Sequence, residues 1–157
     1  MPEQPAHAEL HRWHRRFAVD ANNRAWTLSE KAVLAPEERS ELLHAAHAAA
    51  YHWSKIGTTA QIAHADLLLG RVHALLGHGE SAMTFATEAL DAIGSREAEP
   101  WEAAFAHAIL ADAAAASGRT ALHAEHYAKA KALGGSLADP QERAQFLATF
   151  ALVPAPR

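Results

Sequence analysis

Histidine is the residue type in this chain that could do the most chemistry, because twelve of the 157 residues are histidines. The spacing of His7, His11 and His14 places all three on one face of a helix. Two imidazoles one helical turn apart can chelate zinc, nickel or copper. The same pattern near a chain end is also typical of a solvated helix face, and that is the arrangement we expect here.

A second histidine pattern contains one of the two Glu-x-x-His elements that a di-iron site needs. Glu41, His44 and His47 lie on one helical stripe and contain a Glu-x-x-His element, which di-iron helical bundles use twice, together with two further carboxylates. The sequence contains no second Glu-x-x-His element. We therefore expect no di-iron centre, and we assign no metal ligand and no cofactor to the chain.

The densest group of polar and aromatic side chains lies in two consecutive segments. It consists of Asn22, Asn23, Arg24 and Trp26, followed by His44, His47, Tyr51, His52 and Trp53. Buried polar groups are costly unless they are hydrogen-bonded, so this density favours either a binding site or a core whose polar groups are satisfied. We take these residues, together with Arg71 and His73 from a later segment, as candidate binding residues.

Three Arg–His pairs have the spacing that is the signature of the HEPN ribonucleases, an all-helical superfamily. They are Arg39–His44, Arg71–His78 and Arg119–His126. A chain with so many arginines and histidines contains such pairs by chance, so ribonuclease activity is the least favoured function considered. The sequence also lacks a phosphate-binding glycine loop, a nucleophile elbow and a His-Glu-x-x-His motif. We assign no catalytic residue.

Composition excludes several further classes of protein. The chain has no cysteine, which excludes disulfide scaffolds, thiolate zinc sites and cysteine nucleophiles. Its formal net charge is −4 at pH 7, so electrostatics give no reason to expect nucleic acid or an anionic membrane as a partner. The basic residues Arg12, Arg15, Arg16 and Arg24 lie among acidic residues, which is typical of a solvated helix face.

The chain has the length of one domain, which is enough to bury a hydrophobic core. No segment reaches the roughly 18 apolar residues of a membrane span, since the longest candidate, residues 103–116, contains His107 and Asp112. The first residues lack the apolar stretch of a signal peptide. We therefore expect a single domain over residues 1–157 and a cytoplasmic location.

Alanine dominates the composition, with 40 of the 157 residues. It has the highest helix propensity, and the residues that favour strands are sparse, so we predict an all-α fold. Apolar residues at helical spacing, interrupted by proline and glycine, divide the chain into seven helices. The expected helices cover about residues 6–33, 36–55, 59–76, 80–93, 101–117, 120–133 and 140–152. We expect the tail after Pro154 to be frayed.

Two of these helix pairs, residues 58–94 and 99–135, share one pattern. A small residue in the first helix, a turn glycine, and a small or aromatic residue in the second helix recur at the same offsets. The first unit has Gly70, Gly77 and Ala86 where the second has Ala111, Gly118 and Tyr127. This pattern resembles the tetratricopeptide repeat, a helix–turn–helix unit of about 34 residues.

The resemblance implies a right-handed superhelical stack of antiparallel helical hairpins, with a groove lined by the first, third and fifth helices. Residues 6–56 would form an atypical first hairpin, and residues 139–152 a C-terminal capping helix. His123 departs from the pattern, because it stands where the family prefers a small residue. The spacing of the turn glycines exceeds the usual period and implies a longer connection near Ser95–Pro100.

The first hairpin also resembles a group of small bacterial proteins without an assigned activity. The resemblance is carried by the sequence Tyr51-His52-Trp53 and by the Gly57-Thr58 turn that follows it. It extends over most of the chain. It implies the same tetratricopeptide-like fold and supplies no reaction.

Our leading hypothesis is a non-enzymatic interaction module, because a stack of hairpins presents a groove in which a protein or peptide partner docks. Two or three hairpins are a short array, so we also predict a homodimer formed through a terminal helix. The alternative is a small-molecule or metal-binding protein whose site lies among the histidine, tyrosine and tryptophan residues of the first two helices.

Overall fold

A computed structural model describes residues 6–157, so residues 1–5 of the expected domain lie outside the described part of the chain. The described residues form seven α-helices and no strand, which confirms the all-α prediction. None of these helices is long and apolar enough to cross a membrane. The helices are α1 (His7–Ser29), α2 (Pro36–Ile56), α3 (Thr59–Leu75), α4 (Gly79–Gly94), α5 (Pro100–Ala116), α6 (Thr120–Gly135) and α7 (Pro140–Phe150).

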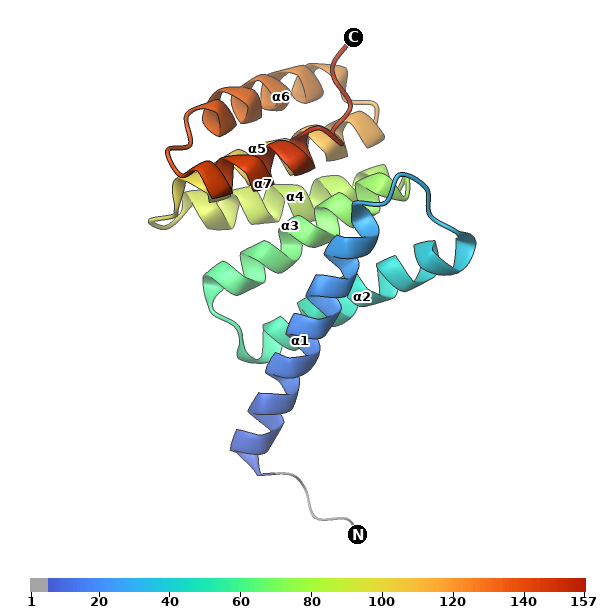
Figure 1. The fold of residues 1–157 in the computed structure, drawn as a ribbon, viewed down its shortest axis with the longest axis vertical. Coiled ribbons are helices and arrows are strands. Elements are labelled where there is room, and N and C mark those ends of the chain that lie inside the picture. Colours follow the sequence, from blue (N-terminus) through green and yellow to red (C-terminus); the bar gives the residue numbers. More distant parts are fainter. Residues whose placement is uncertain (1–5) are drawn as a thin grey trace.

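The first six helices pair as three hairpins that stack one upon the next (Figure 1). Helix α1 packs against α2, α3 against α4, and α5 against α6. Between hairpins, α2 packs against α3 and α4 against α5, while α7 contacts α5 and α6 at the C-terminal end. This packing is consistent with a tetratricopeptide-like stack. The N-terminal end of α1 projects beyond the other helices (Figure 1).

Helix α1 ends earlier than the sequence pattern predicted, at Ser29 rather than near Val33. The Ser29 hydroxyl donates a hydrogen bond to the carbonyl oxygen of Trp26 at 2.8 Å. Ala35 has extended backbone angles, with φ −66° and ψ 158°, directly before Pro36. A residue that precedes proline is sterically disfavoured in a helix. Val33 therefore lies in the connection between α1 and α2, although its apolar side chain fits the helical period.

Side-chain caps begin two helices at the positions that the sequence predicted. The hydroxyl of Thr58 accepts a hydrogen bond from the Gln61 N–H at 3.3 Å, and the Gln61 side chain accepts one from the Thr58 N–H at 3.0 Å. The Asp139 carboxylate accepts hydrogen bonds from the N–H groups of Gln141 and Glu142 at 2.8 and 2.9 Å. Each cap satisfies backbone donors that the first helical turn leaves free.

Glycine has two distinct uses in the repeat-like hairpins. Gly77 and Gly118, the turn glycines of the two units, have positive φ angles of 79° and 73°, a left-handed backbone that glycine adopts without strain. Gly70 instead permits close packing within a helix. A Cβ atom added to Gly70 would lie 2.9 Å from the Ile109 Cγ2 and 3.2 Å from the Ala86 Cβ. The missing side chain therefore lets α3 approach both α4 and α5.

The prediction that the tail from Pro154 to Arg157 frays was wrong at Pro154, which is bonded to α6. Val153 is buried in the same apolar cluster as Phe146 and Phe150. The imidazole Nε2 of His123 donates a hydrogen bond to the carbonyl oxygen of Pro154 at 2.6 Å. The prediction rested on the prolines and on the chain end. It did not allow for an apolar side chain directly after α7 or for a histidine donor on α6.

Gly134 and Gly135 form a matched pair that tests the packing of α7 on α6. A Cβ atom at Gly134 would overlap the ring of Phe146, whereas one at Gly135 meets nothing within 4 Å. We expect Gly134→Ala to lower the free energy of unfolding by about 1–3 kcal/mol through overpacking. Gly135→Ala should leave it unchanged or raise it by up to about 1 kcal/mol, because alanine is the better helix former. Urea denaturation compares the variants, and equal effects would contradict this packing.

Candidate functional site

The structure places the candidate residues of α1 and α2 in different surroundings. Arg24 is exposed and pairs with Glu41 across the hairpin, with Nε–Oε1 and Nη2–Oε2 distances of 2.6 and 2.8 Å. Trp53 is buried and packs against Ala18 and Ala65. Arg24 thus joins the two helices at their surface, and Trp53 contributes to the core between α1, α2 and α3.

Other members of this group are also separated. Trp26 is half-buried against the apolar cluster that joins the first two hairpins. Asn22 is half-buried and Asn23 is exposed. Tyr51 is exposed, and the Lys55 ammonium lies 4.9 Å from the centroid of its ring. Adjacent positions on a helix face different directions, so these candidate residues are close together in the sequence but separated in the structure.

Two of the candidate histidines do meet, and a third residue extends the contact. The Nε2 of His47 lies 3.0 Å from the Nε2 of His73, and the Nδ1 of His73 lies 3.1 Å from the Nδ1 of His78. His73 is buried, whereas His47 and His78 are exposed. We call these three residues the imidazole chain. It links α2, α3 and the turn before α4.

The rings of the imidazole chain point at one another as hydrogen-bonded partners do. Ring centroids lie 5.2 Å apart for His47 and His73 and 5.3 Å apart for His73 and His78. These separations exceed the nitrogen–nitrogen distances by about one ring diameter, so the bonded nitrogens lie between the ring centres. Such nitrogens do not converge on a third point. The described residues contain no group of three His, Asp or Glu side chains arranged to hold a metal ion.

The imidazole chain is satisfied when its rings are neutral, since each neutral ring offers one donor and one acceptor nitrogen. Burial lowers the pKa of His73, and the neighbouring His47 and His78 lower it further. Burial, together with the nearby His44, lowers the pKa of His47. Protonation of two adjoining rings removes the acceptor between them and adds like-charge repulsion. The geometry therefore favours neutral rings.

Two further histidine pairs join the helices of a hairpin. The Nδ1 atoms of His14 and His52 lie 2.8 Å apart between α1 and α2, and those of His107 and His126 lie 2.8 Å apart between α5 and α6. Burial lowers the pKa of His52, His107 and His126. No motif in the sequence indicated these pairs, because each depends on how two helices align.

In two of the three Arg–His pairs with HEPN-like spacing, the arginine and the histidine are bonded to other residues. Arg71 pairs with Asp112, and Arg119 pairs with an exposed glutamate of α4. His78 and His126 bond to other histidines. Within the described residues, no hydrogen bond joins the arginine to the histidine of any of the three pairs. The chance origin of this spacing remains the simplest interpretation.

Arg71, one of the candidate binding residues, lies in the core. Its side chain is 3% exposed and that of its partner Asp112 is 7% exposed. Arg71 also donates a hydrogen bond to the carbonyl oxygen of Ser29 at 3.4 Å, so one guanidinium contacts α1, α3 and α5. Burial raises the pKa of Asp112, and the charge of Arg71 opposes this effect. These contacts give Arg71 a role in joining hairpins.

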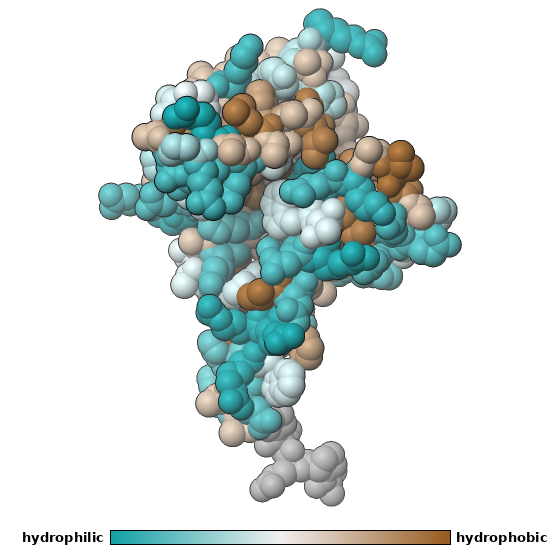
Figure 2. Space-filling model, viewed as in Figure 1, coloured by the Kyte–Doolittle hydropathy of each residue, from teal (hydrophilic) through white to brown (hydrophobic). Residues whose placement is uncertain are grey.

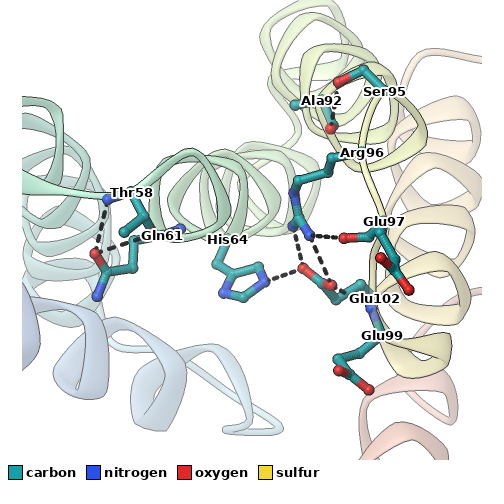
Figure 3. Close-up of polar contacts among 9 residues, drawn as sticks. All are labelled: Thr58, Gln61, His64, Ala92, Ser95, Arg96, Glu97, Glu99 and Glu102. Atoms are coloured by element: carbon teal, nitrogen blue, oxygen red, sulfur yellow. Dashed lines mark hydrogen bonds and ion pairs between the residues drawn. The ribbon is translucent and has the colours of Figure 1, made fainter.

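A polar site that no sequence motif indicated centres on Glu102 (Figure 3). Glu102 is 3% exposed and lies in the first turn of α5. Its carboxylate accepts hydrogen bonds from the His64 Nε2 at 2.6 Å, from the Arg96 guanidinium, and from the Glu99 N–H at 2.8 Å. The donors come from α3, from the connection before α5, and from the start of α5. One carboxylate therefore fastens the second hairpin to the third.

Burial alone would raise the pKa of Glu102, but the hydrogen bonds from Arg96, His64 and Glu99 outweigh it and lower the pKa to about 2. Glu102 is the third residue of α5 and Glu99 is its N-cap, which is the spacing of a capping box. That spacing is a common helix-start pattern and does not by itself indicate a polar site at Glu102. Its partners on α3 and in the connection carry no such pattern.

A cleft of about 300 Å³ lies beside the Glu102 site, between α5 and α7. It is lined by Trp101 and Phe105 of α5 and by Glu142 and Gln145 of α7. The rings of Trp101 and Phe105 are nearly perpendicular, at 86°, with centroids 5.8 Å apart. The other neighbour of Trp101 is the ring of His64, whose centroid lies 5.1 Å away. We call this feature the aromatic cleft.

Apolar side chains are also exposed outside the aromatic cleft, on α1, on α7 and in the connection between α1 and α2. Along α1, Leu10, Trp13 and Phe17 are about half exposed, and the Trp13 ring stacks on that of Phe17 with centroids 5.7 Å apart. Figure 2 shows apolar surface over α7 and over the connection between α1 and α2. Leu147 of α7 and Val33 of that connection are both exposed.

Comparison with known proteins gives no significant similarity: no protein-family model, no curated protein and no solved structure matches the chain. The likeness to tetratricopeptide repeats therefore rests on helix pairing and on the small-residue pattern. The imidazole chain, the Glu102 site and the aromatic cleft are the features from which a function can be inferred.

The imidazole chain predicts that stability falls as the pH is lowered. Because the pKa of His73 in the folded chain lies below its ordinary value of 6.5, the unfolded chain takes up protons first, and stability is lost as the pH falls through 6.5. His73→Leu removes the central ring and leaves His47 and His78 in contact with water. When the pH falls from about 7.5 to about 5.5, we expect the melting temperature of this variant to fall by less than that of the unmodified chain.

His11→Leu is the matched control, because His11 is exposed on α1. Asp66 has the opposite effect on the pH dependence of stability. Burial raises its pKa to about 6, so the folded chain gains stability relative to the unfolded chain as the pH falls through that value. Asp66 is present in every protein compared, so its contribution cancels. An identical pH dependence in His73→Leu and the unmodified chain would contradict the role given to the imidazole chain.

The ion pair of Arg71 and Asp112 predicts a large loss of stability when one partner is removed. Asp112→Ala leaves a buried guanidinium without its counter-ion and should lower the free energy of unfolding by about 3–5 kcal/mol. Glu80→Ala removes the exposed partner of Arg119 and should cost about 0–1 kcal/mol. Urea denaturation at neutral pH compares the two variants. Similar small losses would show that the buried pair does not hold the hairpins together.

Proposed function

We propose that the chain is a non-enzymatic protein-interaction module that binds a peptide segment of its partner at the aromatic cleft. The observation that carries the proposal is a cleft with two aromatic rings on α5 and two polar side chains on α7. Stacked helical hairpins offer extended faces for peptides and helices. Aromatic residues in well-packed surroundings supply much of the binding energy at such faces.

The aromatic walls are fixed before a partner arrives, which supports the proposal. The His64 ring packs on Trp101, and His64 is itself held by its hydrogen bond to Glu102. Phe105 is held from below by Phe146, with ring centroids 5.6 Å apart at 87°. Side chains that are already ordered lose little conformational entropy on binding. The cleft therefore has the rigidity that a recognition site needs.

The size of the aromatic cleft suits one side chain of a partner. Its volume of about 300 Å³ is at the lower limit of small-molecule sites, which span about 300–1,000 Å³. A peptide would insert one anchoring side chain and lay its backbone across the neighbouring surfaces of α5 and α7. This mode of binding needs no chemistry beyond hydrogen bonds, burial and charge.

The small-molecule or metal site proposed for α1 and α2 has less support. Arg24 is bonded to Glu41, and Trp53 is buried in the core. In the imidazole chain the nitrogens point at one another, which is the geometry of hydrogen bonds. Ribonuclease activity has less support still, because Arg71, His78, Arg119 and His126 are bonded to other residues.

Self-association through a terminal helix stays a prediction, and α1 offers the surface for it. Leu10, Trp13 and Phe17 form an exposed apolar stripe along the first half of α1. Arg12 and Arg15 flank this stripe and are exposed. A second copy would therefore have to bring acidic side chains to the stripe.

A peptide-display selection tests the proposed function. Random peptides are selected on the unmodified chain and then tested on Gln145→Trp, which fills the aromatic cleft from an exposed position of α7. We expect the selected peptides to lose at least about tenfold in affinity, which corresponds to about 1.4 kcal/mol. Fluorescence polarisation with labelled peptides measures this loss.

Leu147→Trp is the matched control, because Leu147 is an exposed residue of the same helix that points away from Gln145 at 3.6 residues per turn. Circular dichroism confirms that both variants keep the helical content of the unmodified chain. Selected peptides should bind Leu147→Trp and the unmodified chain equally. Peptides that ignore Gln145→Trp, or a selection that enriches none, would contradict the proposed function.

A further inference from the structure

We infer that the aromatic cleft receives a cationic side chain of the partner, a lysine ammonium or an arginine guanidinium. The inference rests on the proposed function and names the chemistry of the anchoring residue. Two aromatic rings and one carboxylate face a single small cleft. Aromatic faces attract cations through the ring quadrupole, and a carboxylate adds direct charge attraction.

The rings of Trp101 and Phe105 form a corner. Their planes are 86° apart and their centroids are 5.8 Å apart, so a group placed in the corner contacts both rings at once. Paired aromatic walls at such angles are the arrangement that recognises ammonium groups in proteins. An aliphatic stem of lysine or arginine would also pack on these rings, while its charged head reaches the opposite wall.

Glu142 supplies the negative charge of that opposite wall. It takes part in none of the ion pairs among the described residues. Arg143, the next residue, donates from Nε and Nη2 to the carbonyl oxygen of Leu137 at 2.9 and 2.6 Å. The backbone donors at the start of α7 are capped by Asp139. The charge of Glu142 is therefore left for a partner.

Two donor side chains of the neighbouring Glu102 site are already engaged. Arg96 and His64 both donate to the buried carboxylate of Glu102, as Figure 3 shows. Glu97 and Glu99, on the same connection, are exposed and add negative charge. An acidic anchor would meet repulsion here. A purely apolar anchor would cover Glu142 and remove its water without supplying a counter-charge.

Capped amino-acid amides are the probes that test this inference. N-acetyl-lysine methylamide and N-acetyl-arginine methylamide are compared with the neutral norleucine and the acidic glutamate derivatives. Binding to the full chain, labelled with ¹⁵N, is followed through the indole N–H signal of Trp101, which is assigned by its loss in Trp101→Phe. We expect at least one cationic probe to bind about fivefold or more tightly than the norleucine probe, and the glutamate probe to bind most weakly.

Two variants and one control separate charge from shape. Glu142→Gln keeps the size of the side chain and should weaken the cationic probes about fivefold while leaving the norleucine probe unchanged. Gln145→Lys places an ammonium of the chain itself at the cleft and should compete with the cationic probes. Glu9→Gln removes one exposed negative charge on α1 and should bind every probe as the unmodified chain does.

The outcomes distinguish this inference from the proposed function. Norleucine and lysine probes of equal affinity, or no effect of Glu142→Gln, would overturn the inference, while peptides that depend on the cleft would still support docking. If the amides do not shift the indole N–H signal of Trp101, the sequences of the selected peptides test whether the anchoring residue is cationic. A shared lysine or arginine whose replacement by norleucine abolishes binding supports the inference, and its absence overturns it. Selected peptides that ignore the cleft would overturn both proposals.

Discussion

Close approach of helices is the constraint on which the rest of this structure depends. Gly70 brings α3 so near to Ala86 and Ile109 that one added carbon would collide, and buried alanines play the same part at the other interfaces. Each small side chain buries little apolar area, so it contributes little free energy on its own. Polar links such as the Glu102 site therefore lie where one helix or hairpin meets the next.

These polar links are of two physical kinds. Between successive hairpins, α3 and α5 are joined by charged contacts, those of Glu102 with His64 and of Arg71 with Asp112. Between α2, α3 and the start of α4, the link is a series of hydrogen-bonded imidazoles. The charged contacts fix the position of α5, and α5 carries the two rings of the aromatic cleft. The position of the aromatic cleft thus depends on buried electrostatic contacts of α5.

Local features could be predicted from the sequence, and long-range pairings could not. Alanine content, the turn glycines Gly77 and Gly118, and the cap at Asp139 are properties of a few neighbouring residues, and they gave the helices with small errors at the ends. The contact between His64 and Glu102 joins residues 38 positions apart, so it depends on how the hairpins align. The candidates of α1 and α2 were chosen by density along the chain, and neighbouring positions of a helix face different ways.

The imidazole chain has a direction. Each neutral ring carries a single N–H, so His47 either donates to His73, which then donates to His78, or all of these hydrogen bonds run the other way. The buried ring cannot reverse one bond without reversing the other. A group that fixes the outer nitrogen of His78 at the turn therefore also sets which nitrogen of His47 carries its hydrogen on α2. The tautomers of His47 and His78, two surface residues in different hairpins, therefore change together between two states.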